Sequence, residues 1–220
     1  MRHLTADPAA LILGVVVGVG AGLYAHRETG RAVAITHEID SGTSHVPPLY
    51  VLSSLGATAG LLVGFRFGTT AELPAFLYLV AIAPALGAID AATRRLPNFI
   101  VLPSYPLTML LLAFAAWRAD DPAAFWRSLI AAVVVYVFLL AIALASPPHS
   151  LGWADVKLGG LLGLFLGYLG WTTTLLGMMA AWGLAAAYVV ARAVGRGQLG
   201  QPLPLGPALL TGTLMAVIVS

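Results

Sequence analysis

The sequence predicts an all-α protein, folded as a single domain over residues 1–220, that crosses a membrane about eight times. Hydrophobic residues make up 60% of the chain and charged residues only 9%, whereas about a quarter of a soluble domain is charged. The mean hydropathy is +0.93. Apolar runs recur from end to end, most of them close to the roughly 20 residues that one membrane-spanning helix needs.

Eight helices can be drawn from these runs. The stretch 155–192 is too long for one crossing, and Gly170-Trp-Thr-Thr-Thr174 supplies a place to turn, so it is divided into two helices. The first run follows Arg2 and is interpreted as a helix rather than a cleaved signal, because the rest of the chain is equally apolar. The expected segments are 9–25, 49–67, 73–90, 99–117, 126–145, 155–170, 172–192 and 206–220.

Segment 26–48 is the only sizeable polar stretch, and we expect a short solvated loop on the cytoplasmic side. Its histidines and acids are residue types that bind metals, but their spacing matches no metal motif, so we predict neither a metal nor another cofactor. The chain contains no cysteine, which excludes disulfides, thiolate catalysis and cysteine zinc sites. The residues in question are His26, His37, His45, Glu28, Glu38 and Asp40.

The distribution of positive charge predicts the orientation. With eight crossings, one side holds seven cations, namely Arg27, Arg31, Arg94, Arg95, Lys157, Arg192 and Arg196. The other side holds four, namely Arg2, Arg66, Arg118 and Arg127. Because loops rich in lysine and arginine stay in the cytoplasm, both chain termini are expected outside. The pI of about 9.2 follows from these few cations and indicates topology rather than binding to nucleic acid.

Two acids border very apolar segments on the predicted cytoplasmic side. Asp90 ends the run 79–89, and Asp155 lies just ahead of another run, while the other seven acids fall in polar loops or at helix ends. A carboxylate beside hydrocarbon is unfavourable and therefore suggests function. Each also has a purely structural interpretation, because Asp155 suits a helix N-cap and Asp90 can pair with Arg94 or Arg95. Together they suggest a carboxylate pair that activates water.

A stripe of small residues follows Asp155. Gly159, Gly163 and Gly167 recur every four residues and therefore share one face of the predicted helix. Such a face permits close approach of another membrane helix. Close packing there is expected to hold Asp155 rigidly.

Three motifs resemble the signature regions of type IV prepilin peptidases. They are Asp90 followed by Arg94-Arg95-Leu96-Pro97-Asn98, the run Gly152-Trp-Ala-Asp155-Val-Lys157-Leu158, and Pro204-Leu-Gly-Pro207. The resemblance covers roughly residues 49–220. It implies that Asp90 and Asp155 are the catalytic pair. It also implies a prepilin or pseudopilin substrate with a short basic leader, cut at the cytoplasmic face of the inner membrane of a prokaryote.

The same motifs contain the expected supporting or substrate-contacting residues. Lys157 either orients Asp155 and contacts substrate or simply extends to the membrane interface, as lysines near helix ends do. Arg94 serves better as a topology anchor than as a catalyst. Pro97 and Asn98 are expected to form the turn into the next helix, and Gly152 opens the second motif. The oligomeric state is left open, and membrane lipids are expected as neighbours.

Two departures from the family pattern bear on activity. Ala154 stands where the family usually has glycine, a slight change unless that position needs positive φ. Larger members of the family carry a cytoplasmic domain with paired Cys-x-x-Cys motifs that is linked to N-methylation. Here the corresponding segment 26–48 is short and lacks cysteine. The expectation is a peptidase without methyltransferase activity.

The expected mechanism is aspartyl proteolysis. Two carboxyls that share a proton do not both ionise easily, so the ionised one takes a proton from water and the protonated one polarises the scissile carbonyl. Helix dipoles favour Asp155 as the ionised member. Presenilin-type or preflagellin-type proteases share this logic, although presenilin-like enzymes usually carry Tyr-Asp where this chain has Ile89-Asp90. An ion-coupled transporter that uses the two aspartates and a noncatalytic membrane scaffold are also compatible with the sequence.

Overall fold

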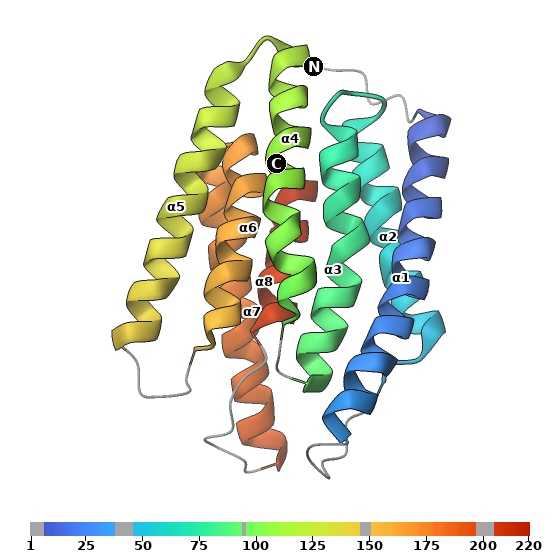
Figure 1. Ribbon diagram of the computed structural model, residues 1–220, viewed down its shortest axis with the longest axis vertical. Coiled ribbons are helices and arrows are strands. Elements are labelled where there is room, and N and C mark those ends of the chain that lie inside the picture. Colours follow the sequence, from blue (N-terminus) through green and yellow to red (C-terminus); the bar gives the residue numbers. More distant parts are fainter. Residues whose placement is uncertain (1–6, 38–45, 94–95, 146–150, 197–204) are drawn as a thin grey trace. The chain divides into compact units, whose positions relative to one another are not determined.

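The computed structural model describes residues 7–37, 46–93, 96–145, 151–196 and 205–220, which contain eight α-helices and no strand. Each predicted segment coincides with one helix, so the all-α prediction is confirmed (Figure 1). The helices are α1 (Pro8–His37), α2 (Leu49–Phe67), α3 (Leu73–Thr93), α4 (Asn98–Ala119), α5 (Pro122–Ala145), α6 (Trp153–Leu169), α7 (Trp171–Arg196) and α8 (Gly206–Val219).

Six helices of the described chain, α1 to α5 and α7, are long and apolar enough to cross a membrane. The protein is therefore a multi-pass membrane protein. Helix α6 has 17 residues and α8 has 14, which at 1.5 Å per residue gives about 26 and about 21 Å, less than the roughly 30 Å hydrocarbon layer. Crossing by these two helices stays a prediction.

Helix α1 corrects one expectation. The loop predicted over 26–48 is wrong for residues 26–37, which continue the helix to His37. This stretch contains no proline to stop a helix, and the Glu28 carboxylate pairs with Arg31 one turn later at 2.7 Å. Polarity alone does not end a helix once it leaves the apolar layer. Only residues 38–48 remain between α1 and α2, and 38–45 lie outside the described residues.

The chain forms two compact units, residues 1–122 and 123–220. In the first unit, α1 and α2 run in opposite directions and meet through glycines. A Cβ on Gly18 would collide with the carbonyl of Gly56, and a Cβ on Gly14 with that of Gly60. These four-residue spacings bring the two backbones into direct contact. Helix α3 packs beside α1, with Ala85 and Ala88 against Ala25, and runs in the same direction as α1 (Figure 1).

In the second unit, the glycine stripe of α6 packs against α5. A Cβ on Gly163 would lie 2.8 Å from the Cα of Ala132, and one on Gly167 would collide with Ala131. The predicted close approach is confirmed, and its partner is α5. Helix α8 packs against α7 through Gly212, which faces the backbone of Ala181.

The division of 155–192 into two helices is also confirmed. Gly170 alone separates α6 from α7, with φ of +144°. That φ is a conformation that favours glycine. The Gly170 carbonyl accepts the hydroxyl of Thr174 at 2.9 Å and its backbone N–H at 3.0 Å, so the sharp turn is tied to the start of α7.

Candidate active site

Asp155 lies in the first turn of α6, and its side chain is buried, with 7% exposed. It is the third residue of the helix, not the N-cap that one interpretation expected. Gly152 is the N-cap, and its backbone N–H donates to Oδ2 of Asp155 at 3.3 Å. This is the reach-back half of a capping box, here made by an aspartate. The carboxylate therefore has a structural part at the helix start, where a negative charge is also favoured by the dipole.

Gly152 leaves room for that carboxylate. Its backbone is extended, with φ of −78° and ψ of 145°, so any residue can adopt it. A Cβ at this position, however, would lie 3.2 Å from Oδ2 of Asp155. The glycine of the second motif therefore provides space rather than backbone freedom.

Ala154 does not need to be glycine. It lies in the helical first turn of α6, and among the described residues only Asp120 has a positive φ without being glycine. Alanine in place of the usual glycine would matter if position 154 needed a positive φ, and it does not.

Arg127 holds the other end of α6. This residue of α5 donates through Nε to the carbonyl of Gly167 at 2.9 Å and through Nη2 to that of Tyr168 at 2.7 Å. A cation at the C-terminus and a carboxylate at the N-terminus both complement the helix dipole. The sequence did not point to Arg127, because its partners lie about 40 residues away and no spacing rule connects them.

Asp90 lies in the last described turn of α3 and is buried, with 4% exposed. Close to it, the hydroxyl of Thr93 donates to the carbonyl of Ile89 at 2.8 Å. A carboxylate near a helix C-terminus is disfavoured by the dipole, in contrast with Asp155. Asp90 belongs to the first unit and Asp155 to the second, and their predicted pairing stays a prediction.

The remaining predicted residues occupy helix starts or lie outside the described chain. Pro97 is the N-cap of α4 in extended conformation, and the exposed Asn98 is its first residue, so both lie where the chain enters α4. Lys157 is half-buried and lies two residues after Asp155, so it projects from a different side of α6. Arg94 lies outside the described residues. The functional roles of these residues stay predictions.

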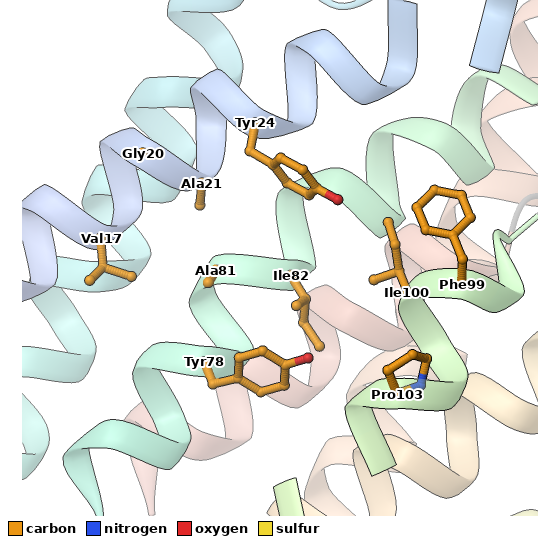
Figure 2. A pocket seen from close by; sticks show the side chains of 10 residues that line it. All are labelled: Val17, Gly20, Ala21, Tyr24, Tyr78, Ala81, Ile82, Phe99, Ile100 and Pro103. Atoms are coloured by element: carbon orange, nitrogen blue, oxygen red, sulfur yellow. The ribbon is translucent and has the colours of Figure 1, made fainter. Parts of the chain in front are cut away.

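A groove of about 450 Å³ lies in the first unit, between α1, α3 and α4. Figure 2 shows its wall, in which apolar side chains surround the two phenols of Tyr24 and Tyr78. The hydroxyl of Tyr78 is hydrogen-bonded to that of Ser104 at 2.7 Å, which ties α3 to α4. The lining residues are Val17, Gly20, Ala21, Tyr24, Tyr78, Ala81, Ile82, Phe99, Ile100 and Pro103.

Comparison with known proteins points to one family. The model of the type IV leader peptidase family matches residues 75–190, a range that includes both Asp90 and Asp155. A relative from Pseudomonas putida is 28% identical over 170 residues, covering 77% of this chain and 58% of the relative. One from Burkholderia pseudomallei (strain 1026b) is 33% identical over 169 residues, covering 75% and 52%.

A third relative, from Bacillus subtilis (strain 168), is 32% identical over 163 residues, covering 70% of this chain and 59% of the relative. All three are named prepilin leader peptidase/N-methyltransferase. The chain spans somewhat more than half the length of these relatives. No solved structure matches it.

Proposed function

The chain belongs to the type IV leader peptidase family, and we propose that it is an aspartyl endopeptidase that removes the leader of prepilin-like or pseudopilin-like proteins. The observation that carries the proposal is the burial of two acids at the ends of apolar helices. Asp90 and Asp155 are both buried in terminal turns of apolar helices, and both fall within the residues that the family model matches. A buried carboxylate in a membrane protein is retained for function more often than for stability.

In the proposed mechanism, Asp90 and Asp155 act as one unit that shares a proton. The ionised carboxylate takes a proton from water as this water attacks the scissile carbonyl, and the protonated carboxyl donates a hydrogen bond to the carbonyl oxygen. Proton return to the leaving nitrogen then breaks the C–N bond. Neither covalent acyl-enzyme nor metal is needed for this sequence of steps.

The two helix ends support an assignment within the pair. Asp155 lies at a helix N-terminus and accepts the Gly152 N–H, and both features stabilise a negative charge. Asp90 lies near a C-terminus, where negative charge is disfavoured. We assign Asp155 as the carboxylate that takes the proton from water and Asp90 as the protonated member.

The proposed activity is proteolysis without N-methylation, although the relatives are named for both. The chain contains no cysteine, and α1 ends at His37 while α2 begins at Leu49. The stretch between these helices is too short for a domain with paired Cys-x-x-Cys motifs. Mass spectrometry of a pilin processed by this protein alone should therefore find an unmodified N-terminus.

The proposed location is the inner membrane of a prokaryote, with cleavage at the cytoplasmic face, as the distribution of lysine and arginine predicts. Reporter fusions after residues 40, 95 and 148 should then report cytoplasm, and those after 70 and 121 the exterior. An ion-coupled transporter is less well supported. Its ion ligands are expected near the bilayer midplane, whereas both aspartates occupy terminal turns.

The decisive test replaces each aspartate by asparagine and measures leader removal from a full-length prepilin in liposomes. Asp90→Asn and Asp155→Asn should each abolish cleavage, and the double variant should lose no more than either single one, because the residues act as a unit. Asp120→Asn is the matched control. Asp120 is exposed, and its left-handed backbone tolerates asparagine. Substantial cleavage by a folded single variant would rule out the mechanism.

Proximity of the two acids is tested separately by disulfide cross-linking. The chain has no native cysteine that could form competing disulfides. An Asp90→Cys/Asp155→Cys variant should form a disulfide on mild oxidation, because a shared proton requires side chains about as close as disulfide geometry does. Asp90→Cys/Asp120→Cys serves as the control pair. Equal cross-linking of both pairs, or of neither under strong oxidation, would contradict the proposed carboxylate pair.

A further inference from the structure

We propose that the groove between α1, α3 and α4 receives the hydrophobic helix of the prepilin-like substrate, and that Glu28 beyond its end receives the basic leader. This inference rests on the proposed function and adds where the substrate lies. It concerns the first unit alone.

The α1 wall of the groove follows one face of that helix. On α1 it is lined by Val17, Gly20, Ala21 and Tyr24, which follow the three-to-four-residue spacing of a single helical face. They span about 10 Å, or two turns. A helix that docks in a groove inserts anchors at the same spacing. Because these residues lie in segments that cross the membrane, the inserted side chains have to be apolar.

Gly20 lies at a position on α1 that no other described helix contacts closely, unlike the glycines that face α2. The glycines at 14, 18 and 22 are in contact with the backbone of α2. In contrast, a Cβ at Gly20 would meet no heavy atom of the described residues within 4 Å. A glycine on an open face of a membrane helix permits another helix to approach closely. Gly20, labelled in Figure 2, is one of the residues that line the groove, so this open position belongs to the groove wall.

Charge complementarity identifies the occupant. The groove face of α1 continues to Glu28, one turn beyond Tyr24. The Glu28 side chain is only 14% exposed, and its partner Arg31 is 73% exposed. A cationic side chain of the leader can therefore take the place of Arg31 at a carboxylate that is already largely screened from water. An apolar helix preceded by a basic segment is complementary both to the apolar groove and to the Glu28 carboxylate beyond its end. An uncharged lipid chain is complementary to the apolar groove alone.

The direction of the helices is consistent with cleavage at that end. Helices α1 and α3 run the same way (Figure 1), so Glu28 and Asp90 both lie beyond the groove toward the C-terminal ends of their helices. Asp90 follows Ile82 by eight residues, or about 12 Å along α3. A helix seated in the groove thus places the segment that precedes it at the level of Asp90.

The test fills the groove without disturbing its walls. Gly20→Phe introduces a ring into open space, and Gly183→Phe on α7 is the matched control, because a Cβ there also meets no described atom within 4 Å and Gly183 does not line the groove. Two substrates are compared, a full-length prepilin in liposomes and a soluble peptide that contains the leader and cleavage site but no hydrophobic helix.

Gly20→Phe should raise KM for full-length prepilin by about tenfold or more, the loss expected when a buried anchor is displaced, and should leave peptide cleavage unchanged. Unchanged cleavage of full-length prepilin would overturn the groove as docking site, and so would an equal loss with both substrates. If the wild-type protein cleaves neither substrate, the proposed function fails instead.

Glu28 is tested with the peptide substrate. Glu28→Gln should raise the KM for a peptide with a basic leader. The KM for a peptide whose leader cations are replaced by glutamine should stay unchanged. Equal effects on both peptides would overturn the assignment of Glu28. Cross-linking identifies the occupant directly, with a photoreactive residue at Phe99 in the groove and, as control, at Phe114 on the exposed surface of the same helix. Capture of lipid or of a second copy of this chain at Phe99, in place of prepilin, would also overturn the proposal.

Discussion

The backbone N–H of Gly152 donates to Oδ2 of Asp155, and a Cβ on the same glycine would lie 3.2 Å from that oxygen. The hydrogen bond orients the buried carboxylate, and the missing side chain leaves Oδ2 uncrowded on that side. A residue that orients a carboxylate without crowding it suits an acid that has to exchange a proton with water.

Gly152→Ala should therefore reduce cleavage while the protein stays folded. The added methyl lies closer to Oδ2 than the usual van der Waals contact of about 3.5 Å, so the carboxylate has to shift by a few tenths of an ångström. The effect should appear in kcat, measured with the soluble peptide, and should be larger for Gly152→Val.

Ala154→Gly is the control for that experiment, because it restores the residue usual in the family next to the same acid. Since Ala154 has no positive φ, activity should stay close to wild type, with a loss of stability of about 0.5–1 kcal/mol from glycine in a helix. A large gain in activity would mean that the alanine restricts the site in a way the backbone does not reveal.

Alanine substitutions in the glycine stripe of α6 should destabilise the protein to different degrees, depending on which atoms the new methyl contacts. Gly163→Ala brings a methyl against the backbone of Ala132, whereas Gly159→Ala meets the side chain of Leu139, which can rotate. Overpacking of this kind destabilises by about 1–3 kcal/mol. Thermal unfolding in detergent should rank Gly163→Ala as the less stable variant, and the opposite rank would contradict the packing of α6 on α5.

Arg127→Met should destabilise the second unit by about 1–2 kcal/mol, because two carbonyls at the end of α6 lose charged donors. Arg127→Lys keeps the charge but not the two-pronged geometry, and should fall between wild type and Arg127→Met. Arg118→Met removes an exposed arginine from the last turn of α4 and is the control. Equal stabilities of Arg127→Met and Arg118→Met would show that the helix cap is unimportant.

Asp7 should make the start of α1 sensitive to acid. Its carboxylate accepts the hydroxyl of Thr69 at 2.8 Å and the N–H of Ala9 at 3.0 Å, and these bonds hold the pKa of Asp7 below its usual value of 3.8. Because the folded-state pKa is the lower one, the contribution to stability is complete above pH 3.8 and is lost as the pH falls through the folded pKa.

The measurement is the unfolding temperature in detergent from about pH 6 to about pH 3. Asp7→Asn still caps the helix but no longer titrates, so its unfolding temperature should fall less steeply over this range than that of the wild type. Thr69→Val should also flatten the curve, since it removes the main cause of the lowered pKa. Parallel curves for all three proteins would contradict this role of Asp7.

The helices were predictable because each depends on a local property. About 20 apolar residues in succession have to satisfy their backbone hydrogen bonds within the segment, so hydropathy located all eight helices, with every boundary but the end of α1 within a few residues. The misplaced end of α1 has the same origin. Hydropathy reports where the apolar layer ends, whereas the helix ends only where its hydrogen bonding stops, and residues 26–37 contain nothing that stops it.

The hydrogen bonds of Arg127 and the open position of Gly20 could not be predicted in this way. Arg127 was visible only as a charge in the topology count, and Gly20 only as one of 24 glycines in the chain. Their roles depend on segments 40 to 80 residues distant, namely the end of α6 for Arg127 and the lining residues of α3 and α4 for Gly20.

The sequence by itself determined that this is a helical membrane protein with two acids, Asp90 and Asp155, at the ends of apolar helices. Only the tertiary structure decided that Gly152 leaves space beside Asp155, that α5 covers the glycine stripe of α6, and that α1 presents an open face to a groove. The reason is physical. Transfer of a segment into the membrane is a sum over its own residues, whereas packing depends on the shapes of two surfaces that meet only when the chain has folded.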